Sequence, residues 1–503
     1  MLLPEIIQRS ARKTPDKIAL VWKELHWNYR EYLDNVEQMA KALHAHGIGH
    51  GDRVALFMKN QPEIVFSYFA CFYLGAIAVP LNSRYQAAEA EYAMNHCGCK
   101  LLIVDSEFYT CVADLRPSTP TLEKIVVVGG AHGQAESYQA FLENAPAKVE
   151  WPEVKPHDPA AIFYTSGTTD KPKGVTYTHY SLYNSALNQV TSRQFKPDDV
   201  VLAVTHLCHA AASVGLMLPC AWQGGTLVIL PDFDPAACLQ ALEKTKANVI
   251  LLMPIELLEI LDHPLLDETD LSSLQCCLCG GDKVPMDLYR RFKNRLGFEL
   301  TEGCGMTECE GYATNPPYGE KRPGSIGKPA HGTTLKLVDP KGKEVPTGEH
   351  GQILVKSKAV MAGYWNDPIN TRKTLQKGWL YTGDLAYRDE DGYYWFVGRI
   401  KEIIIRGGSN IAPGEVENVL DMHPKVKLAG VIGMPDAKWG AIVKAYVMLE
   451  PDVSYPPTKD ELHTFALEKL AAYKVPEIWE FVEYLPTTAT GKLDRKALHK
   501  LSS

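Results

Sequence analysis

The sequence is short of the features that mark several protein classes. Twelve cysteines in 503 residues are too sparse for a disulfide framework, and the one C-x-x-C, Cys276 to Cys279, has no second pair that would complete a zinc ribbon. Basic residues do not exceed acidic ones, because 52 against 60 leaves a net charge of −8. That balance leaves no global basic field that would hold nucleic acid. We therefore expect a reduced protein with buried strand thiols and no nucleic-acid partner.

Long apolar segments are also missing. The longest apolar run, 65–81, covers 17 residues and is broken by Gly75 and Pro80, which places it at the edge of bilayer-spanning length. A buried helix that ends near Gly75, followed by a short strand at 76–79, explains the run better. The first residues include acidic and proline positions where a signal peptide needs an apolar stretch. The sequence thus predicts a soluble, cytoplasmic protein without a transmembrane segment.

What is present is ordinary globular composition, with 46% apolar and 22% charged residues. At roughly 150 residues per domain, the length predicts two to four domains. Over the first 300 residues, strand-like runs alternate with helical patterns, which favours layered α/β architecture with largely parallel sheets. Strands are expected at 53–57, 76–79, 101–104, 124–128, 200–204, 226–230, 249–252 and 274–278, and helices at 63–74, 235–244 and 286–296.

The pattern changes after about residue 325. Short alternating strands with Asp/Gly turns, expected at 334–338 and 352–356 around a turn at 340–342, predict a hairpin or barrel-like β subdomain. From residue 401 a compact α/β segment of roughly 100 residues follows, which is long enough for an independent domain. We find no internal repeat and no low-complexity tract.

The most informative stretch is 161–174, AIFYTSGTTDKPKG. An apolar strand leads directly into four hydroxyl side chains, two lysines and two glycines. Small residues let backbone N–H groups approach an anion closely, and hydroxyl and ammonium groups add donors around it. The order G-x-x-x-x-G-K-[ST] is absent and Pro172 disfavours a helix directly after Gly167, so this is no Walker A loop. A polar surface loop is the alternative.

This loop resembles the phosphate loop of the adenylate-forming enzymes, which include acyl- and aryl-CoA synthetases, peptide-synthetase adenylation domains and firefly-type luciferases. Family motifs follow in family order over residues 5–497, most like those of a bacterial-type acyl-CoA ligase. The resemblance implies a large N-terminal domain, 1–400, that binds ATP and the acid, and a small mobile C-terminal lid domain, 401–503. Asp170 departs from the glycine that is usual in the family. The loop residues implied to bind nucleotide are Thr165, Ser166, Gly167, Thr168, Thr169 and Lys173.

A second motif, 304–308, resembles the family's aromatic-Gly-x-Thr-Glu sequence. The resemblance implies that Glu308 helps hold Mg²⁺, a hard cation that prefers oxygen ligands, and that Thr307 contacts phosphate. Cys304 stands where the family has the aromatic residue that stacks on adenine. The sequence 280–282, Gly-Gly-Asp, resembles the adenine-side loop. The further nucleotide-binding positions implied here are Gly281, Asp282, Gly303 and Cys304.

A hairpin brings two further candidates together. Asp391-Gly392 is a strong turn signal between expected strands at 385–387 and 393–397. Asp384 and Arg399 lie symmetrically about that turn, so we expect them to face one another across the ladder. An exposed salt bridge is the alternative interpretation. The resemblance implies that Asp384 grips the ribose hydroxyls and that Arg399 assists near ribose and phosphate.

The C-terminal segment carries the remaining motifs. Lys492 follows small and hydroxyl residues and a glycine in PTTATGK, a flexible arm able to deliver a point charge, and matches the family's catalytic lysine. Lys401 matches the hinge between the domains. The implied CoA-binding positions are Gly407 and Gly408, which leave room for pantetheine, with Trp439, Tyr473 and Lys474. For Trp439, packing in a domain core is the alternative.

The acid site implied by the resemblance involves His209, Ala210, Met253 and Gly303. Small residues there leave room for an aryl ring or an alkyl chain, and the choice stays open. His206 is interpreted as a satisfied core histidine.

We therefore expect an ATP-dependent acid–CoA ligase that forms an acyl-adenylate from a fatty or aromatic acid and then the CoA thioester, releasing AMP and pyrophosphate. The chain ends soon after the lysine loop without a carrier domain, which favours free CoA as acceptor. A stand-alone adenylating enzyme that loads a carrier protein or an amine is the alternative. A non-catalytic nucleotide-binding relative stays open because of Asp170 and Cys304. ATP, Mg²⁺, CoA and a small carboxylic acid are the implied ligands, and a homodimer is compatible with the sequence.

Overall fold

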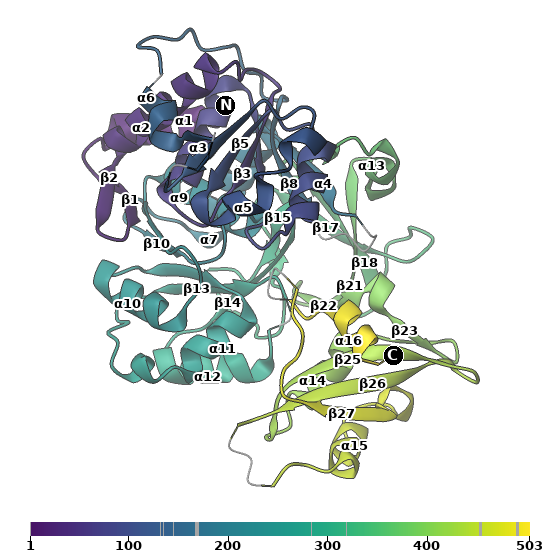
Figure 1. The fold of residues 1–503 in the computed structure, drawn as a ribbon. Coiled ribbons are helices and arrows are strands. Elements are labelled where there is room, and N and C mark those ends of the chain that lie inside the picture. The colour runs from purple at the N-terminus through teal and green to yellow at the C-terminus, as the bar shows by residue number, and fades with distance from the viewer. Residues whose placement is uncertain are drawn as a thin grey trace.

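The computed structural model describes residues 2–502 apart from 131, 134, 144, 166–170, 283, 318, 452–454 and 489–491. The chain forms a large N-terminal part, built from two many-stranded sheets and a smaller antiparallel sheet, and a separate C-terminal part below it (Figure 1). This arrangement confirms the predicted α/β class with layered sheets, a β subdomain and a small C-terminal α/β unit.

The first large sheet has the order β19-β9-β8-β4-β3-β5-β6-β7, and its central strands are parallel. Residues of β3 alternate between two cores, with Val54 and Leu56 in one and Ala55 and Phe57 in the other. Both faces of the sheet are therefore covered, as continuous apolar strands predict. Its strands are β3 (Arg53–Phe57), β4 (Ile77–Pro80), β5 (Leu101–Asp105), β6 (Lys124–Val128), β7 (Glu136–Ser137), β8 (Pro159–Thr165), β9 (Lys173–Thr178) and β19 (Gly363–Tyr364).

The second large sheet has the order β16-β15-β14-β13-β12-β10-β11-β1-β2, again with a parallel centre. The largest core lies between the two sheets and contains helices α1, α2, α3 and α7, while α10, α11 and α12 pack on the outer face of the second sheet. Its strands are β1 (Ile18–Trp22), β2 (Leu25–Asn28), β10 (Val200–Ala203), β11 (Thr226–Ile229), β12 (Val249–Leu252), β13 (Cys276–Gly280), β14 (Thr301–Met306), β15 (Cys309–Thr314) and β16 (Lys328–Pro329).

Helices connect and cover these sheets. The N-terminal helices are α1 (Pro4–Lys13), α2 (Tyr29–Ala45), α3 (Pro62–Leu74), α4 (Ala87–Cys97), α5 (Tyr109–Val112), α6 (Tyr138–Glu143), α7 (His179–Arg193), α8 (Ala210–Ala212), α9 (Leu218–Gln223), α10 (Pro235–Thr245), α11 (Pro254–Asp262), α12 (Met286–Leu296) and α13 (Pro368–Thr374). A π-helical segment, Ser213–Met217, joins α8 to α9.

Helix α3 explains the longest apolar run of the sequence. All its residues are buried except Glu63, as expected for a helix that is apolar on every side. It starts at Pro62 and ends at Leu74, and the capping residue Gly75 has a φ of +61°, the left-handed conformation that glycine adopts without strain. The helix and the strand β4 after it confirm the buried-helix interpretation. No helix in the part of the chain that the structure describes combines the length and apolar character needed to cross a bilayer.

The third sheet is antiparallel, with the order β17-β18-β21-β20 and β22 beside β21. Its strands are β17 (Thr333–Val338), β18 (Gly351–Ser357), β20 (Leu375–Gln376), β21 (Trp379–Arg388) and β22 (Tyr394–Arg399). The register pairs Asp384 with Arg399, as predicted. The turn itself differs from the prediction, because Tyr393 lies in the loop rather than in the strand, and Asp389 bonds across to Tyr393. A bulge between Leu385 and Ala386 shifts the register by one and restores the predicted pair.

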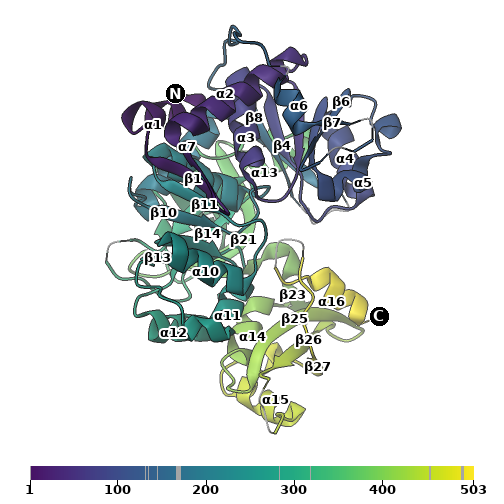
Figure 2. The same cartoon turned by 60° about the vertical axis from the view of Figure 1, so that its left-hand side comes forward.

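The C-terminal part has its own apolar core and follows β22 through the 3₁₀ turn Ile400–Glu402. Figure 2 shows its sheet of β25, β26 and β27 to one side of the N-terminal part. A hairpin, β23 (Ile404–Arg406) with β24 (Ser409–Ile411), precedes a three-stranded sheet of β25, β26 and β27. The remaining elements are β25 (Val426–Asp436), β26 (Gly440–Leu449), β27 (Ile478–Val482), α14 (Pro413–Leu420), α15 (Lys459–Leu467) and α16 (Arg495–Leu501).

Candidate active site

The site lies at the carboxyl ends of β13 and β14, where ligands commonly bind in open α/β sheets. Gly280 and Gly303 pair there so closely that a Cβ on Gly280 would come 2.5 Å from the carbonyl oxygen of Gly303. The next residue, Gly281, has a φ of +86°, and a Cβ on it would come 2.8 Å from Met253 and 4.0 Å from Cε of Lys492. The C-terminal lysine therefore reaches the end of the N-terminal sheet.

The segment that carries Lys492 is fixed to both domains. The backbone N–H of Leu493 donates to Oδ2 of Asp282 at 2.9 Å, across the domain boundary. On the C-terminal side, the N–H of Lys492 donates to Oγ1 of Thr488 at 3.2 Å. Asp282, predicted as a nucleotide contact, is thus also an anchor for the lysine segment. Residues 489–491, the flexible stretch expected before the lysine, lie outside the described residues.

Electrostatics tie Lys492 to several separate elements. Burial raises the pKa of Asp384 to about 6, against the lowering influence of Arg399 and of the Lys492 ammonium. Burial lowers the pKa of His209 to about 3, and the charges of His206 and Lys492 lower it further. One ammonium group therefore acts on side chains from β21 and from the start of α8. The structure brings together residues that are more than 280 positions apart.

Asp384 is buried, with 4% of its surface exposed, and its Oδ1 accepts no hydrogen bond in the described part of the chain. Nε of Arg399 lies 3.2 Å from this oxygen, in an ion pair whose arginine side chain is 43% exposed. An unmet acceptor at a buried position costs free energy, and a pair of hydroxyl donors would meet it. The pair is therefore not the exposed salt bridge considered from the sequence, because the Asp384 carboxylate is buried and only the Arg399 guanidinium is exposed.

Glu308 and Thr307 connect β14 to β15. Oε1 of Glu308 accepts a hydrogen bond from the hydroxyl of Tyr364 at 2.7 Å, and the carbonyl oxygen of Thr307 accepts one from Tyr177 at 2.7 Å. Glu308 is 8% exposed, and its Oε2 accepts no hydrogen bond from the described residues. A carboxylate oxygen with spare capacity suits Mg²⁺, which binds through one or two carboxylates together with substrate phosphates.

The phosphate loop is described only at its two ends. Thr165 closes β8 and pairs with Lys173 at the start of β9. The predicted contacts Ser166, Gly167, Thr168 and Thr169, and the departure Asp170, lie outside the described residues. Nζ of Lys173 lies 4.9 Å from the ring centre of Tyr364, whose hydroxyl bonds to Glu308.

Tyr364 was missed by the sequence analysis. It lies on the short strand β19, which pairs with β9 although nearly 190 positions separate them. No local pattern around Tyr364 predicts that pairing, so the sequence alone carries no signal for it. The tyrosine orients both the loop lysine and the candidate metal-binding carboxylate.

Cys304 replaces an aromatic ring with a small thiol. Its Sγ lies 3.0 Å from the hydroxyl of Tyr312, and burial raises the pKa of the thiol to about 12. The thiol is therefore neutral near pH 7 and is a poor nucleophile there. Tyr312, on the neighbouring strand β15, brings an aromatic side chain to the thiol.

The candidate acid-binding residues come from three elements. His209 and Ala210 begin α8, Met253 precedes α11, and Gly303 lies on β14. Gly303 has the carbonyl oxygen of Ala313 3.2 Å from the place of a Cβ, so no larger residue fits there without movement. His206, by contrast, is satisfied by Oγ of Ser83 at 2.7 Å and by Asp232.

The CoA-binding candidates lie on the C-terminal part. Gly407 and Gly408, with φ of +55° and +84°, form the tip of the β23–β24 hairpin. The indole of Trp439 covers Gly407, its carbonyl accepts from the N–H of Gly407 at 2.8 Å, and 39% of its surface is exposed. That exposure argues against the core-packing interpretation of Trp439. Tyr473 is 37% exposed and Lys474 pairs with Glu415.

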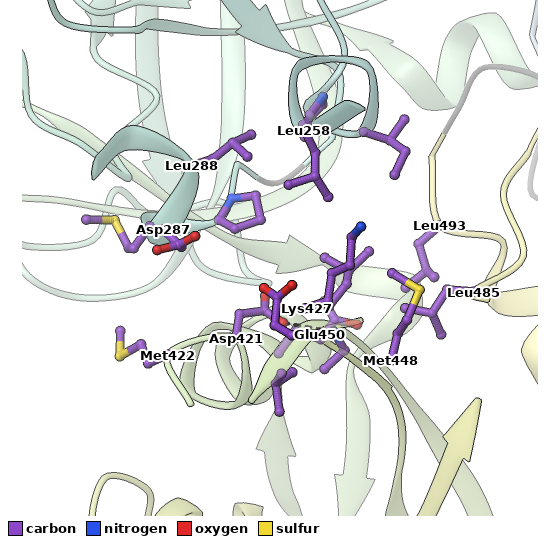
Figure 3. Close-up of a pocket in the computed structure, with 18 of the residues that line it drawn as sticks. Leu258, Asp287, Leu288, Asp421, Met422, Lys427, Met448, Glu450, Leu485 and Leu493 are labelled. Atoms are coloured by element: carbon purple, nitrogen blue, oxygen red, sulfur yellow. Dashed lines mark hydrogen bonds between the residues drawn. The ribbon is translucent and has the colours of Figure 1, made fainter. Parts of the chain in front are cut away.

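A cavity of about 1030 Å³ separates the two domains beside the lysine segment. Figure 3 shows Leu258 and Leu288 of the N-terminal helices facing Met448 and Leu485 of the C-terminal part. Near it, Nζ of Lys427 lies 3.4 Å from Asp262 and bridges the domains. The interface on this side therefore consists of a few polar contacts around an open space.

A two-domain α/β architecture in which a C-terminal segment brings a lysine to the end of a parallel sheet is that of the adenylate-forming enzymes. Residues 7–365 match the AMP-binding enzyme family and residues 415–492 match the AMP-binding enzyme C-terminal domain. The chain belongs to this family.

Three similar proteins illustrate the relationship. A feruloyl-CoA synthase of Amycolatopsis sp. is 36% identical over 96% of this chain and 96% of its own length. A long-chain-fatty-acid–CoA ligase of Bacillus subtilis is 32% identical over 99% of this chain and 94% of its own. The crystal structure of the anthranilate CoA ligase AuaEII in complex with anthranoyl-AMP superposes with a TM-score of 0.94, at 32% identity, over 100% of this chain and 97% of that one.

The stability of the fold should depend on pH through Glu302, two residues before Cys304. Burial raises its pKa to about 8, and it accepts a hydrogen bond from Tyr289. Between pH 4.5 and 8 the Glu302 carboxyl is therefore protonated in the folded state and ionised in the unfolded state. Its contribution to the free energy of unfolding falls as pH rises through that range. Relative to wild type, Glu302→Gln should gain roughly 1.4 kcal/mol per pH unit across that range.

Urea unfolding at pH 5, 6, 7 and 8 measures this difference. Glu268→Gln, at an exposed carboxylate, is the matched control and should show no such trend. A constant difference between Glu302→Gln and wild type across the four pH values would contradict the raised pKa.

Proposed function

We propose that this protein is an AMP-forming acid–CoA ligase, which converts a carboxylic acid, ATP and CoA into an acyl-CoA thioester, AMP and pyrophosphate. The observation that carries the proposal is the approach of Lys492 to Gly281, within the electrostatic reach of Asp384 and His209. Relatives named as CoA ligases support CoA as acceptor over a carrier protein or an amine. Membership of the family supports ATP as the nucleotide.

The first half-reaction overcomes the poor reactivity of a carboxylate, whose leaving group would be an oxide. The substrate carboxylate attacks the α-phosphorus of ATP, pyrophosphate leaves, and an acyl-AMP mixed anhydride remains. Negative charge shifts onto oxygens of the transferring group, so catalysis requires orientation and fixed positive charge. Lys492 supplies that charge from the C-terminal domain, and Lys173 does so from the start of β9.

The buried carboxylate of Asp384 and its neighbours would orient the nucleotide. Asp384 offers Oδ1, which lacks a hydrogen bond in the described part of the chain, to the ribose hydroxyls. Arg399 beside it is exposed enough to reach a phosphate oxygen. Gly281 and Gly303 leave space on the adenine and acid sides, and Cys304 lies on the side of the base.

Glu308 is the residue that would hold Mg²⁺, with Thr307 close by for phosphate. When bound, Mg²⁺ supplies positive charge to the pyrophosphate leaving group. Tyr364 keeps the Glu308 carboxylate in place through its hydroxyl, and the same ring holds Lys173 at 4.9 Å. The chain therefore arranges its own groups around the place that phosphates take.

The second half-reaction needs a thiol in place of Lys492. We place a domain boundary at 400/401, with rotation about Lys401, so that the C-terminal domain withdraws Lys492 and presents Gly407 and Gly408 to the site. Trp439, exposed beside Gly407, gives CoA an aromatic surface, and Tyr473 with Lys474 gives it an aromatic ring and a positive charge. The CoA thiolate then attacks the acyl carbonyl and AMP leaves.

Two assays on the purified protein test the proposal. Exchange of labelled pyrophosphate into ATP should depend on an added carboxylic acid, and AMP release should then depend on CoA. Acid-dependent exchange without CoA-dependent AMP release would favour a carrier protein or an amine as acceptor. Absence of exchange with every acid of a broad panel would exclude an adenylating enzyme.

The hinge assignment makes a prediction for Lys401→Pro. Proline fixes φ near −65°, a value within the 3₁₀ range of the turn Ile400–Glu402. The variant should keep the orientation seen here and retain adenylation, whereas rotation for thioester formation becomes costly. Thioester formation from supplied acyl-AMP should fall about tenfold or more, which needs only about 1.4 kcal/mol of added barrier.

Stopped-flow or quench measurements of the two half-reactions separate these effects. Lys401→Ala is the control, since it removes the same exposed side chain without fixing φ. Equal thioester rates in Lys401→Pro and Lys401→Ala would place the pivot elsewhere.

A further inference from the structure

A buried charge pair, Arg193 with Glu310, lies beside the candidate acid site and has no part in the chemistry described above. Glu310 follows the 304–308 motif on β15, and Arg193 is the last residue of α7. Their side chains are 9% and 7% exposed, and NH2 of Arg193 lies 3.9 Å from Oε1 of Glu310. That separation is longer than the 2.7–2.9 Å typical of a charge-assisted hydrogen bond.

Both partners keep unused hydrogen-bonding capacity. Nε of Arg193 is buried without a hydrogen bond in the described part of the chain, and NH1 donates to the carbonyl of Gly215 at 3.2 Å. Neither carboxylate oxygen of Glu310 accepts a hydrogen bond from the described residues. Of these atoms Nε of Arg193 is fully enclosed, whereas the Glu310 oxygens are not, so a ligand group that enters beside them can complete their hydrogen bonding.

The surroundings of Glu310 place it on the acid side of the site. A Cβ on Gly215 would come 3.2 Å from Oε1 of Glu310, and a Cβ on Gly305 would come 3.2 Å from Oε2. The carboxylate therefore lies between Gly215 of the π-helical segment and Gly305 of β14. These are the elements that also carry the acid-site candidates Ala210 and Gly303.

Glu310 packs against the helical segment beyond the acid-site candidate Ala210. Gly215 follows Ala210 by five residues in one continuous helical segment, which corresponds to roughly 7 Å at the helical rise. Glu310 meets this segment from β15 at Gly215, five residues beyond Ala210.

We propose that Glu310, positioned by Arg193, selects acids that carry a hydroxyl or amino group at the end remote from the carboxylate. The hydroxyl or amine donates a hydrogen bond to Glu310, and Arg193 holds the carboxylate in position. A hydrocarbon acid of the same shape leaves the buried carboxylate unmet and binds worse, as sites built for a polar group reject analogues that lack it. This inference rests on the proposed ligase function and names its substrate class.

Hydrogen bonds from α7 also hold the backbone that carries Glu310. Nε2 of Gln189, one turn before Arg193 on α7, donates to the carbonyl oxygens of Glu310 and Gly311 at 3.0 and 3.4 Å. Gly311 has a φ of +60°, and a Cβ there would overlap the Gln189 amide. The backbone that carries Glu310 is therefore held in one place.

Pyrophosphate exchange with matched acids tests the proposal. Benzoic, cinnamic and octanoic acids are each compared with a hydroxylated partner (4-hydroxybenzoic, 4-hydroxycinnamic and 8-hydroxyoctanoic acid), and benzoic acid also with 4-aminobenzoic acid. For at least one pair, the substituted acid should have a kcat/KM at least tenfold higher, with the KM for ATP unchanged. Arg193→Met with Glu310→Leu, which removes both charges together, should abolish or reverse that ratio.

Two further variants keep the result interpretable. Glu310→Gln retains one carbonyl acceptor and should keep a reduced preference, whereas Glu349→Gln, at an exposed carboxylate, should leave the ratio unchanged. Circular dichroism and thermal melting establish that each variant is folded. Equal kcat/KM within every matched pair, or a preference that persists in the double variant, would overturn the inference while leaving the ligase proposal intact. Absence of exchange with all acids would overturn the ligase proposal, and this inference with it.

Discussion

Lys492→Ala should reduce the adenylation rate by about 10²–10³-fold, the loss typical when one preorganised donor is removed from a developing negative charge. The physical reason is specific to this geometry. Lys492 arrives at Gly281 from another domain, and its segment is anchored by the bond from Leu493 to Asp282. Truncation removes the ammonium without disturbing that anchor, which uses backbone atoms of the segment.

The second half-reaction should be spared in the same variant. Thioester formation from supplied acyl-AMP and CoA takes place, in the proposed cycle, after Lys492 has been withdrawn. Lys496→Ala, an exposed lysine on α16, is the matched control and should leave both rates near wild type. Equal losses in both half-reactions of Lys492→Ala would remove the lysine from its assigned role.

The second large effect is expected at Asp384. A hydrogen bond to a charged group contributes about 1.5–3 kcal/mol, and 1.4 kcal/mol corresponds to a factor of ten in Kd. Asp384→Ala should therefore weaken ATP binding by roughly 10- to 100-fold. Arg399 loses its partner but is 43% exposed, so water can solvate it and the fold should tolerate the change.

Titration calorimetry with ATP measures this effect. Glu390→Ala, an exposed carboxylate in the loop that joins β21 to β22, removes a charge of the same sign and should leave the affinity within twofold of wild type. An unchanged ATP affinity in Asp384→Ala would exclude this carboxylate from the ribose site. Acid binding, measured separately, should not change in either variant.

The pairing of Asp384 with Arg399 shows how far local patterns lead. The turn signal at Asp391-Gly392 placed the hairpin correctly, and the predicted pair forms. The loop nevertheless extends to Tyr393, and a bulge near Leu385 offsets that difference by one residue. A turn is determined by a few adjacent residues and can be predicted from the sequence, whereas a bulge depends on how the strand must bend in its sheet.

Contacts between residues far apart in the chain could not be predicted from the sequence unless a family motif contained them. Lys492 was identified through its motif, and the structure brings it to Gly281. Tyr364, Gln189 and Arg193 belong to no recognised pattern and were missed, although they hold Lys173, Glu308 and Glu310 in place. Their roles arise from packing between strands and helices that are far apart in the chain, and packing leaves no periodic trace.

The strands themselves were predictable for a physical reason. Parallel strands covered on both faces are continuous apolar runs, so 53–57 and 124–128 match β3 and β6 at both ends. Helix α12 at 286–296 was located by its helical pattern instead, with Leu288, Tyr289 and Phe292 on its buried side. Short strands such as β16 and β19 have two residues each, and no periodicity can be recognised over that length.

The cavity between the two domains should affect how readily the enzyme passes from one half-reaction to the other. Because about 1030 Å³ there is not filled by side chains and few contacts such as Lys427 with Asp262 cross it, parting the two surfaces exposes little tightly packed apolar area. Swinging the smaller domain away should then be easy compared with rearranging a close-packed interior. A compound wedged into that hollow would act on the alternation between the two half-reactions, without competing for the place of ATP.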